Sequence, residues 1–201
     1  MDDLLRQIQT FFESASTFTI LLAAGLSGAI ETIFPPFPSE GVLLLASFAG
    51  ARRHLSPWTI IVVSALGSFA SLYALYLVGR GPLRNRMKRL LERWIGKAEK
   101  SVKSFFDRWG YGAVLVSRFL PAIRGPLAFL AGVYHLKPLP TGAALLAGCF
   151  LWNGLVVFLG YRTGRVWDGS TGGLMWAGLA LAGATLFLWF LGAGLYRLVR
   201  K

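Results

Sequence analysis

Three long uncharged runs constrain the fold of this chain more than any other feature. They cover residues 55–79, 138–161 and 169–196, and each exceeds the ~20 apolar residues that an α-helix needs to cross a bilayer. A fourth run, at residues 14–30, has about the minimum spanning length. A soluble core has no use for so many such runs. The sequence therefore predicts an all-α polytopic membrane protein with about four spanning helices.

The N-terminal residues 1–13 place apolar side chains at helical spacing among charged ones. This pattern predicts an amphipathic interfacial helix rather than a cleaved signal peptide, and residues 14–201 then form a single membrane domain. Cys149 is the only cysteine, which excludes an internal disulfide and a cysteine-based zinc site. We interpret it as a packing residue. Known catalytic, phosphate-loop and metal motifs are absent from the sequence, so no enzyme activity, cofactor or metal is expected.

A basic connector is predicted at residues 80–108, which contain ten Lys and Arg residues and only three acidic residues. The chain as a whole has a net charge of +12. By the positive-inside rule this connector is cytoplasmic. Its apolar residues recur at helix-like intervals, which favours an amphipathic helix bound to the anionic lipids of the inner leaflet. Because membrane segments flank the connector, nucleic acid is not an expected partner.

The charge distribution also predicts the topology. With residues 80–108 inside, the segments 138–161 and 169–196 cross outward and back, and both termini are cytoplasmic. The segment 109–137 must then start and finish inside, and 35–50 must start and finish outside, so each is predicted to be a re-entrant hairpin. This scheme places fifteen Lys and Arg residues inside and four outside.

Two hairpins that enter from opposite faces predict an inverted repeat, the pattern of secondary transporters with a site near the bilayer midplane. The halves share a Phe-Pro turn that is followed by Ala49-Gly50 in one and by Ala131-Gly132 in the other. Small residues in the run 169–196 allow helices to associate without requiring it, which leaves a homo-oligomer open.

Four ionisable residues fall at membrane depth, where charge is costly unless it faces a cavity or a partner. Arg118 and Arg124 offer guanidiniums that bind phosphate in a bidentate manner, and the break at Gly125 supplies backbone N–H groups. Glu31 and Glu40 are candidates for binding and releasing protons as substrate phosphate displaces them from the arginines. Static Glu–Arg pairs that hold the hairpins together are the open alternative.

Other residues in these segments have predicted structural roles. Pro35, Pro38 and Pro121 prevent a continuous helix through the hairpins. Trp152, Asn153 and Gly154 are expected to interrupt their span, with Asn153 bonding between helices. Close packing and interface anchoring are expected of the last pair, Gly160 and Tyr161.

These residues resemble the motifs of the DedA family of bacterial membrane proteins, which share a fold with the VTT-domain lipid scramblases. The matching stretches lie within residues 20–165. They are ETIFPPFPSE from Glu31 to Glu40, SRFLPAIRG around Arg118 and Arg124, and Trp152-Asn153 followed by Gly160-Tyr161. The combination is specific, although each motif alone is weak.

The resemblance implies transport of a lipid phosphate carrier, with undecaprenyl phosphate as the first expectation, across the bacterial cytoplasmic (inner) membrane. It also implies dependence on the proton gradient through two acids and two arginines, which here are Glu31, Glu40, Arg118 and Arg124. The alternatives are a phosphatidylethanolamine flippase or scramblase, a proton-coupled small-cation antiporter, and a non-transporting membrane scaffold.

Overall fold

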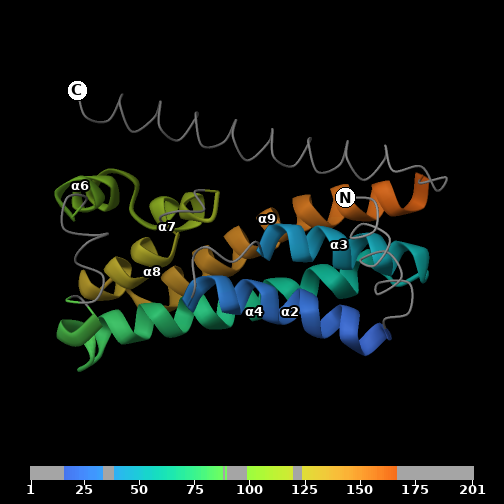
Figure 1. Cartoon of the computed structure of the whole chain (residues 1–201). Coiled ribbons are helices and arrows are strands. Elements are labelled where there is room, and N and C mark those ends of the chain that lie inside the picture. Colours follow the sequence, from blue (N-terminus) through green and yellow to red (C-terminus); the bar gives the residue numbers. More distant parts are fainter. Residues whose placement is uncertain (1–15, 34–38, 88, 90–98, 120–123, 167–201) are drawn as a thin grey trace, which may run out of the picture. The chain divides into compact units, whose positions relative to one another are not determined.

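The computed structural model describes residues 16–33, 39–87, 89, 99–119 and 124–166 (Figure 1). The regular elements of these residues are α-helices, which confirms the predicted all-α class. In chain order they are α2 (Thr17–Ile33), α3 (Ser39–Arg52), α4 (Pro57–Arg80), α6 (Glu99–Trp109), α7 (Tyr111–Ser117), α8 (Arg124–Val133) and α9 (Pro138–Val166). The predictions for residues 1–13 and 169–196, and for Pro35, Pro38 and Pro121, fall outside the described residues.

Two of these helices, α4 and α9, are long and apolar enough to cross a membrane. They confirm the helices predicted from the uncharged runs 55–79 and 138–161. Each begins with a proline, Pro57 or Pro138, at its first helical position, where the missing N–H would have had no intrahelical acceptor. The shorter helix α2 is also apolar and covers most of the fourth run.

The helix α9 corrects one prediction. Trp152, Asn153 and Gly154 were expected to interrupt this span, but α9 continues unbroken to Val166. The polar residue needs no break, because the Asn153 amide Nδ2 donates a hydrogen bond of 3.3 Å to the Ser68 hydroxyl oxygen. The interhelical bond expected of Asn153 is therefore made from a regular helix.

The chain divides into two compact units, and the long helices contribute one half to each. Unit 1 contains the segments 1–68 and 153–183, and its described helices are α2, α3, the first half of α4 and the second half of α9. Unit 2 contains the segments 69–152 and 184–201, and its described helices are the second half of α4, α6, α7, α8 and the first half of α9.

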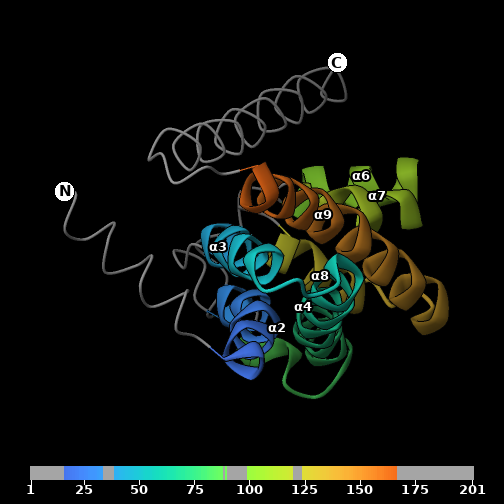
Figure 2. The same cartoon turned by 90° about the vertical axis from the view of Figure 1, so that its right-hand side faces the viewer.

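Unit 1 is held together by close backbone approach at glycines. Helices α2 and α3 lie side by side, as Figure 2 shows. A Cβ atom at Gly67 of α4 would overlap the carbonyl oxygen of Gly25 in α2. On α9, a Cβ atom at Gly160 would lie 2.6 Å from the carbonyl oxygen of Leu44 in α3. The close packing predicted for Gly160 is thus observed, against α3.

In unit 2, a glycine also allows the backbones of α4 and α8 to approach closely. A Cβ atom at Gly79 would overlap the carbonyl oxygen of Phe129. The hydroxyl of Tyr76 donates a 2.7 Å hydrogen bond to the carbonyl of Leu136, and Arg80 donates to the same carbonyl at 3.0 Å. These bonds tie the end of α4 to the turn that follows α8.

The amphipathic helix α6 belongs to unit 2 and lies partly within the basic connector. Its Phe106 is buried and meets the ring of Tyr134 edge to face, with 5.9 Å between the ring centroids. Lys103, Asp107 and Arg108 are exposed. One apolar face of α6 therefore packs on the unit, and its charged face is open to solvent or to lipid head groups.

A repeated turn joins the short and long helices of both units. His54 and His135, 81 positions apart, both adopt left-handed backbone with φ of 56° and 55°. In each turn the next residue, Leu55 or Leu136, donates its N–H to a carbonyl five residues back, at 2.9 and 3.1 Å. The spacing of 81 also relates Gly79 of α4 to Gly160 of α9. The two turns and the two closely packed glycines thus recur at the same spacing in the two units.

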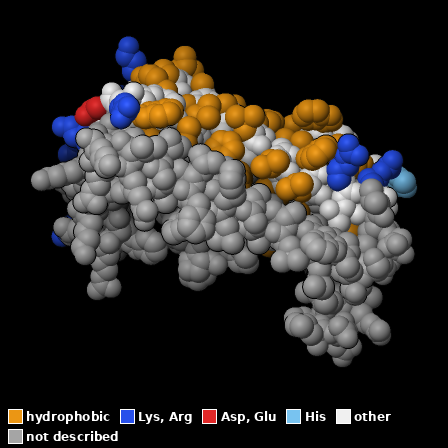
Figure 3. All heavy atoms as spheres, turned by 90° about the horizontal axis from the view of Figure 1, so that it is seen from above, with side chains coloured by type: hydrophobic (Ala, Val, Ile, Leu, Met, Phe, Trp, Pro, Cys, Tyr) orange, Lys and Arg blue, Asp and Glu red, His pale blue; other side chains and the backbone are white. Residues whose placement is uncertain are grey.

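On the face that Figure 3 shows, many of the coloured side chains are hydrophobic, and the described helices expose many large hydrophobic residues. On α2 every fourth residue is a large exposed hydrophobe, namely Phe18, Leu22, Leu26 and Ile30. Such a stripe on a soluble protein would mark an interaction site, and on a membrane helix it faces lipid.

Candidate functional site

Unit 1 brings both predicted acids to one serine. Glu31 lies in the last turn of α2, and Ser39 and Glu40 open α3. The hydroxyl of Ser39 donates a hydrogen bond to the Glu31 carboxylate and reaches Oε2 of Glu40 at 3.2 Å. Glu31 and Ser39 are buried, with 6% and 4% of their surface exposed, and Glu40 is half-buried.

The chemistry of this acidic cluster follows from the single proton of a hydroxyl group. Ser39 can donate to only one carboxylate at a time, so bonding to both at once requires a proton on one of the acids. Glu40 sits at the positive end of α3, which favours its charge, whereas Glu31 sits at the negative end of α2. The two acids therefore lie in unequal electrostatic surroundings.

Ser39 was not among the residues singled out from the sequence. The available signal was its position after the Pro-rich stretch, since serine is strongly preferred where a helix starts. Its contact with Glu31, eight residues earlier, depends on how α2 and α3 lie together and could not be inferred from propensity.

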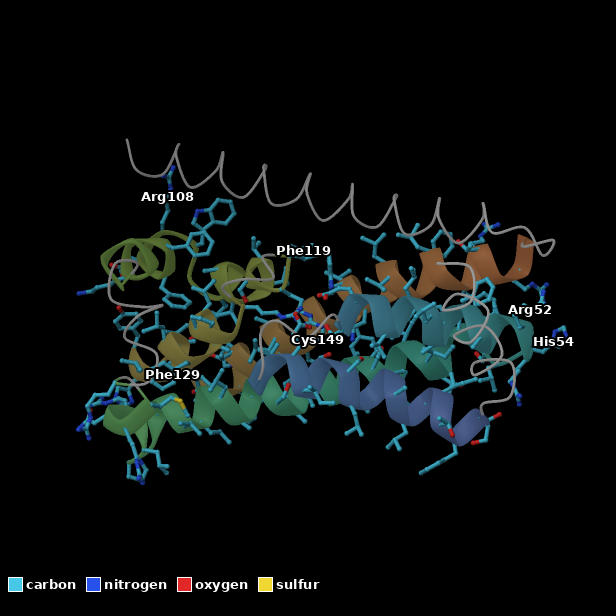
Figure 4. The ribbon with its side chains drawn as sticks, viewed as in Figure 1. Arg52, His54, Arg108, Phe119, Phe129 and Cys149 are labelled. Atoms are coloured by element: carbon cyan, nitrogen blue, oxygen red, sulfur yellow. The ribbon has the colours of Figure 1, made fainter. Side chains whose placement is uncertain are left out.

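Unit 2 brings both predicted arginines to α9. Arg118 caps the end of α7 and Arg124 is the first residue of α8, and both are buried, with 4% and 3% exposed. The positive charges of both act on the side chain of Cys149, so both guanidiniums lie near this residue. Figure 4 labels Cys149 on α9.

The electrostatics of this arginine pair favour an anion. Two like charges buried near one side chain repel each other, and a bound anion removes that repulsion. Arg124 stands at the positive end of α8, a poor place for a cation alone but a good place for a cation that shares an anion with the helix N-terminus. Guanidinium groups also match the geometry of phosphate oxygens.

Close packing on α9 positions the arginine pair. A Cβ atom at Gly148 would lie 2.9 Å from the carbonyl oxygen of Leu115 and 3.3 Å from Cβ of Arg118, so only glycine lets α7 approach α9 this closely. Next to Arg118, the ring of Phe119 (Figure 4) meets Trp152 edge to face, with 5.6 Å between centroids. Arg118, Phe119 and Trp152 thus belong to one packed cluster.

The other predicted residues have separate surroundings. Gly125 lies in α8, and a Cβ atom there would make ordinary contact with Leu75 at 3.6 Å. Tyr161 is half-buried on α9. Unit 1 therefore holds both acids, and unit 2 holds both arginines together with Gly125. Within the described residues, no group of three or more His, Cys, Asp or Glu side chains is placed to hold a metal ion.

Long apolar helices and two helix breaks with buried charges define the class of an integral membrane protein with a polar site. The model of the VTT domain matches residues 37–162, and this chain belongs to that family of membrane proteins, the DedA family. The match includes both arginines, Ser39 and Glu40, and Glu31 lies just before it.

Several curated bacterial proteins are similar to this chain. Undecaprenyl phosphate transporter A of Staphylococcus aureus is 28% identical over 166 residues, covering 80% of this chain and 78% of the relative. An alkaline phosphatase-like protein of Lactococcus lactis is 34% identical, covering 69% and 68%. The uncharacterized membrane protein YkoX of Bacillus subtilis is 29% identical, covering 94% and 81%. No solved structure matches the chain.

Proposed function

We propose that this protein moves a lipid phosphate carrier, with undecaprenyl phosphate as the substrate, between the leaflets of the bacterial cytoplasmic membrane. The observation that carries the proposal is the burial of Arg118 and Arg124 together near Cys149. Two guanidiniums in an apolar setting form a binding site for a phosphate monoester. The similarity to undecaprenyl phosphate transporter A supports this substrate.

The substrate tail stays in lipid while its head group binds. Leu151, directly before Trp152 on α9, has 56% of its surface exposed. The hydrophobic outer surface of α9 is therefore one residue away from the buried cluster. A prenyl chain gains nothing by entering protein, since lipid already solvates it. The protein therefore has to shelter only the phosphate.

Protons drive the movement in this proposal. The segments 35–50 and 109–137 re-enter the membrane from opposite faces, and both termini are cytoplasmic. Binding of phosphate at Arg118 and Arg124 is coupled to uptake of a proton at the Glu31–Ser39–Glu40 cluster. The one-proton chemistry of Ser39 supports this role.

The basic connector holds the protein to anionic lipids of the inner leaflet, and the exposed Lys103 and Arg108 of α6 are suited to that contact. Anionic head groups gathered there raise the local concentration of lipid phosphate.

The test is movement of undecaprenyl phosphate in proteoliposomes. We expect Arg124→Gln to abolish it, because the neutral and shorter amide removes the guanidinium charge and its paired N–H donors. Arg165→Gln, at an exposed position near the end of α9, is the matched control and should keep transport. Normal transport by a folded Arg124→Gln protein would overturn the proposal.

The same vesicles separate the alternatives. Movement of phosphatidylethanolamine without undecaprenyl phosphate would indicate a phospholipid flippase, and cation-dependent proton flux without lipid movement would indicate an antiporter. Release of inorganic phosphate from the lipid would indicate hydrolysis, and no flux of any kind would leave a scaffold. Each of these results contradicts the proposed substrate or activity.

A further inference from the structure

Trp152 carries a buried polar atom that the proposed function does not yet use. Its side chain is 1% exposed, and its indole Nε1 has no hydrogen-bond acceptor among the described residues. A buried N–H group without an acceptor is costly, so nearly all such groups in proteins find a partner. An indole N–H is a donor only, and its partner must offer an oxygen lone pair.

The position of Trp152 links this donor to the arginine pair. It follows Cys149 by three residues on α9, so the two side chains occupy the same helix face. Cys149 lies within the influence of both arginine charges, and the ring of Trp152 packs edge to face on Phe119, the residue after Arg118. The ring contact with Phe119 and the helical spacing from Cys149 therefore both place the indole beside the residues that hold the guanidiniums.

We propose that the indole N–H of Trp152 donates a hydrogen bond to an oxygen of the phosphate bound by Arg118 and Arg124. This inference rests on the proposed function and adds a substrate-binding residue to it. A third cation at this place would add repulsion to two buried positive charges, whereas a neutral donor supplies direction without charge. The rigid ring, packed on Phe119, fixes where the third oxygen must lie.

A third donor also predicts which class of lipid phosphate binds more tightly. A phosphate monoester has three terminal oxygens, enough for both guanidiniums and the indole. A phosphodiester head group has only two terminal oxygens and a single negative charge, so it offers weaker and fewer acceptor positions to the same three donors. The cluster is therefore expected to prefer a lipid monophosphate to a phosphodiester lipid such as phosphatidylglycerol.

The test replaces Trp152 with 3-benzothienylalanine, which keeps the ring shape but has sulfur in place of N–H, and measures binding of undecaprenyl phosphate to the full-length protein in detergent. We expect affinity to fall about 10-fold, in the range for losing one hydrogen bond to a charged group. Binding of undecaprenol, which lacks the phosphate, should not change. The same replacement at Trp58, which is 71% exposed on α4, is the control and should change neither.

A spectroscopic measurement separates this role from a structural one. The indole ¹⁵N–¹H resonance of Trp152, assigned by its loss in Trp152→Phe, should shift when undecaprenyl phosphate is added and stay unchanged with undecaprenol. An unchanged resonance, or unchanged phosphate affinity in the sulfur analogue, would overturn the inference.

The Arg124→Gln protein keeps the two proposals distinguishable. If it loses phosphate binding while the sulfur analogue at Trp152 keeps it, the inference about Trp152 fails and the proposed function stands. If Arg124→Gln binds and moves the lipid normally, the proposed function itself fails.

Discussion

Units 1 and 2 share one plan and differ in the sign of the charge at its centre. Each has a helix, a break, a short helix, a left-handed histidine turn and half of each long helix. Unit 1 has Glu31 in the last turn of α2 and Glu40 in the first turn of α3, and unit 2 has Arg118 at the end of α7 and Arg124 at the start of α8. The backbone plan thus depends on glycine, proline and histidine positions that recur, while the chemistry depends on a few residues that do not.

The comparison of helix dipoles shows why each pair is internally unequal. In unit 1 the positive end of α3 favours the charge of Glu40, and the negative end of α2 disfavours the charge of Glu31. In unit 2 the negative end of α7 favours the charge of Arg118, and the positive end of α8 disfavours the charge of Arg124. Each unit therefore holds one charge that its own backbone stabilises and one that benefits from an external partner.

The largest expected effect comes from breaking the shared plan at Gly79 and Gly160. An added methyl group would collide with the carbonyl of Phe129 or of Leu44, and we expect Gly79→Ala and Gly160→Ala each to lower the free energy of unfolding by about 3 kcal/mol. Thermal unfolding in detergent measures this.

The matched control for these substitutions is Gly154→Ala on α9, where a Cβ atom would meet nothing within 4 Å. Alanine is the better helix former there, so stability should stay the same or rise by up to about 1 kcal/mol. A large loss at only one of Gly79 and Gly160 would show that the repeat does not extend to packing.

A smaller effect should follow from removing the serine hydroxyl that contacts both acids in unit 1. Ser39→Ala deletes the hydroxyl that bonds both acids, and we expect proton-driven lipid movement to fall about 10-fold, equivalent to about 1.4 kcal/mol. Ser39→Thr keeps the hydroxyl and should keep transport.

The control for Ser39 is Ser47→Ala, because the Ser47 hydroxyl donates only locally along α3, to the carbonyl of Leu43 at 2.6 Å. Equal transport by the Ser39→Ala and wild-type proteins would remove Ser39 from the proton pathway.

The smallest effect concerns the turns that both units share. His54 and His135 occupy left-handed backbone, which glycine adopts without steric cost, so His54→Gly and His135→Gly should each raise stability by about 0.5 kcal/mol. Valine at either position should lower it, since a β-branched residue tolerates this backbone poorly. Shifts of opposite sign at the two turns in thermal unfolding would contradict their equivalence.

Much of this fold follows from the sequence because its signals are local. Uncharged length predicted α4 and α9. The expected interruption at Trp152–Gly154 was wrong because an asparagine in an apolar run looks like a break until its partner, Ser68, is known.

The candidate site was predictable only in part. Glu31, Glu40, Arg118 and Arg124 stood out because charge in apolar sequence is conspicuous. Cys149 was interpreted as a packing residue, and its place near both arginines depends on how α7 and α8 fold against α9. Ser39 gave no comparable signal, since serine is ordinary in membrane segments. Trp152 stood out only as part of an expected interruption and of the Trp152-Asn153 motif, and its buried N–H depends on how α9 packs in the fold.

The buried position of Cys149 allows its alkylation to report on opening of the protein. It is the sole thiol of the chain and is fully enclosed, so a water-soluble alkylating reagent can react only when the arginine cluster opens. Reagents applied separately to each side of a sealed vesicle would record which compartment the cluster faces during a transport cycle. Negatively charged reagents should outpace positively charged ones, because the neighbouring guanidiniums attract the former.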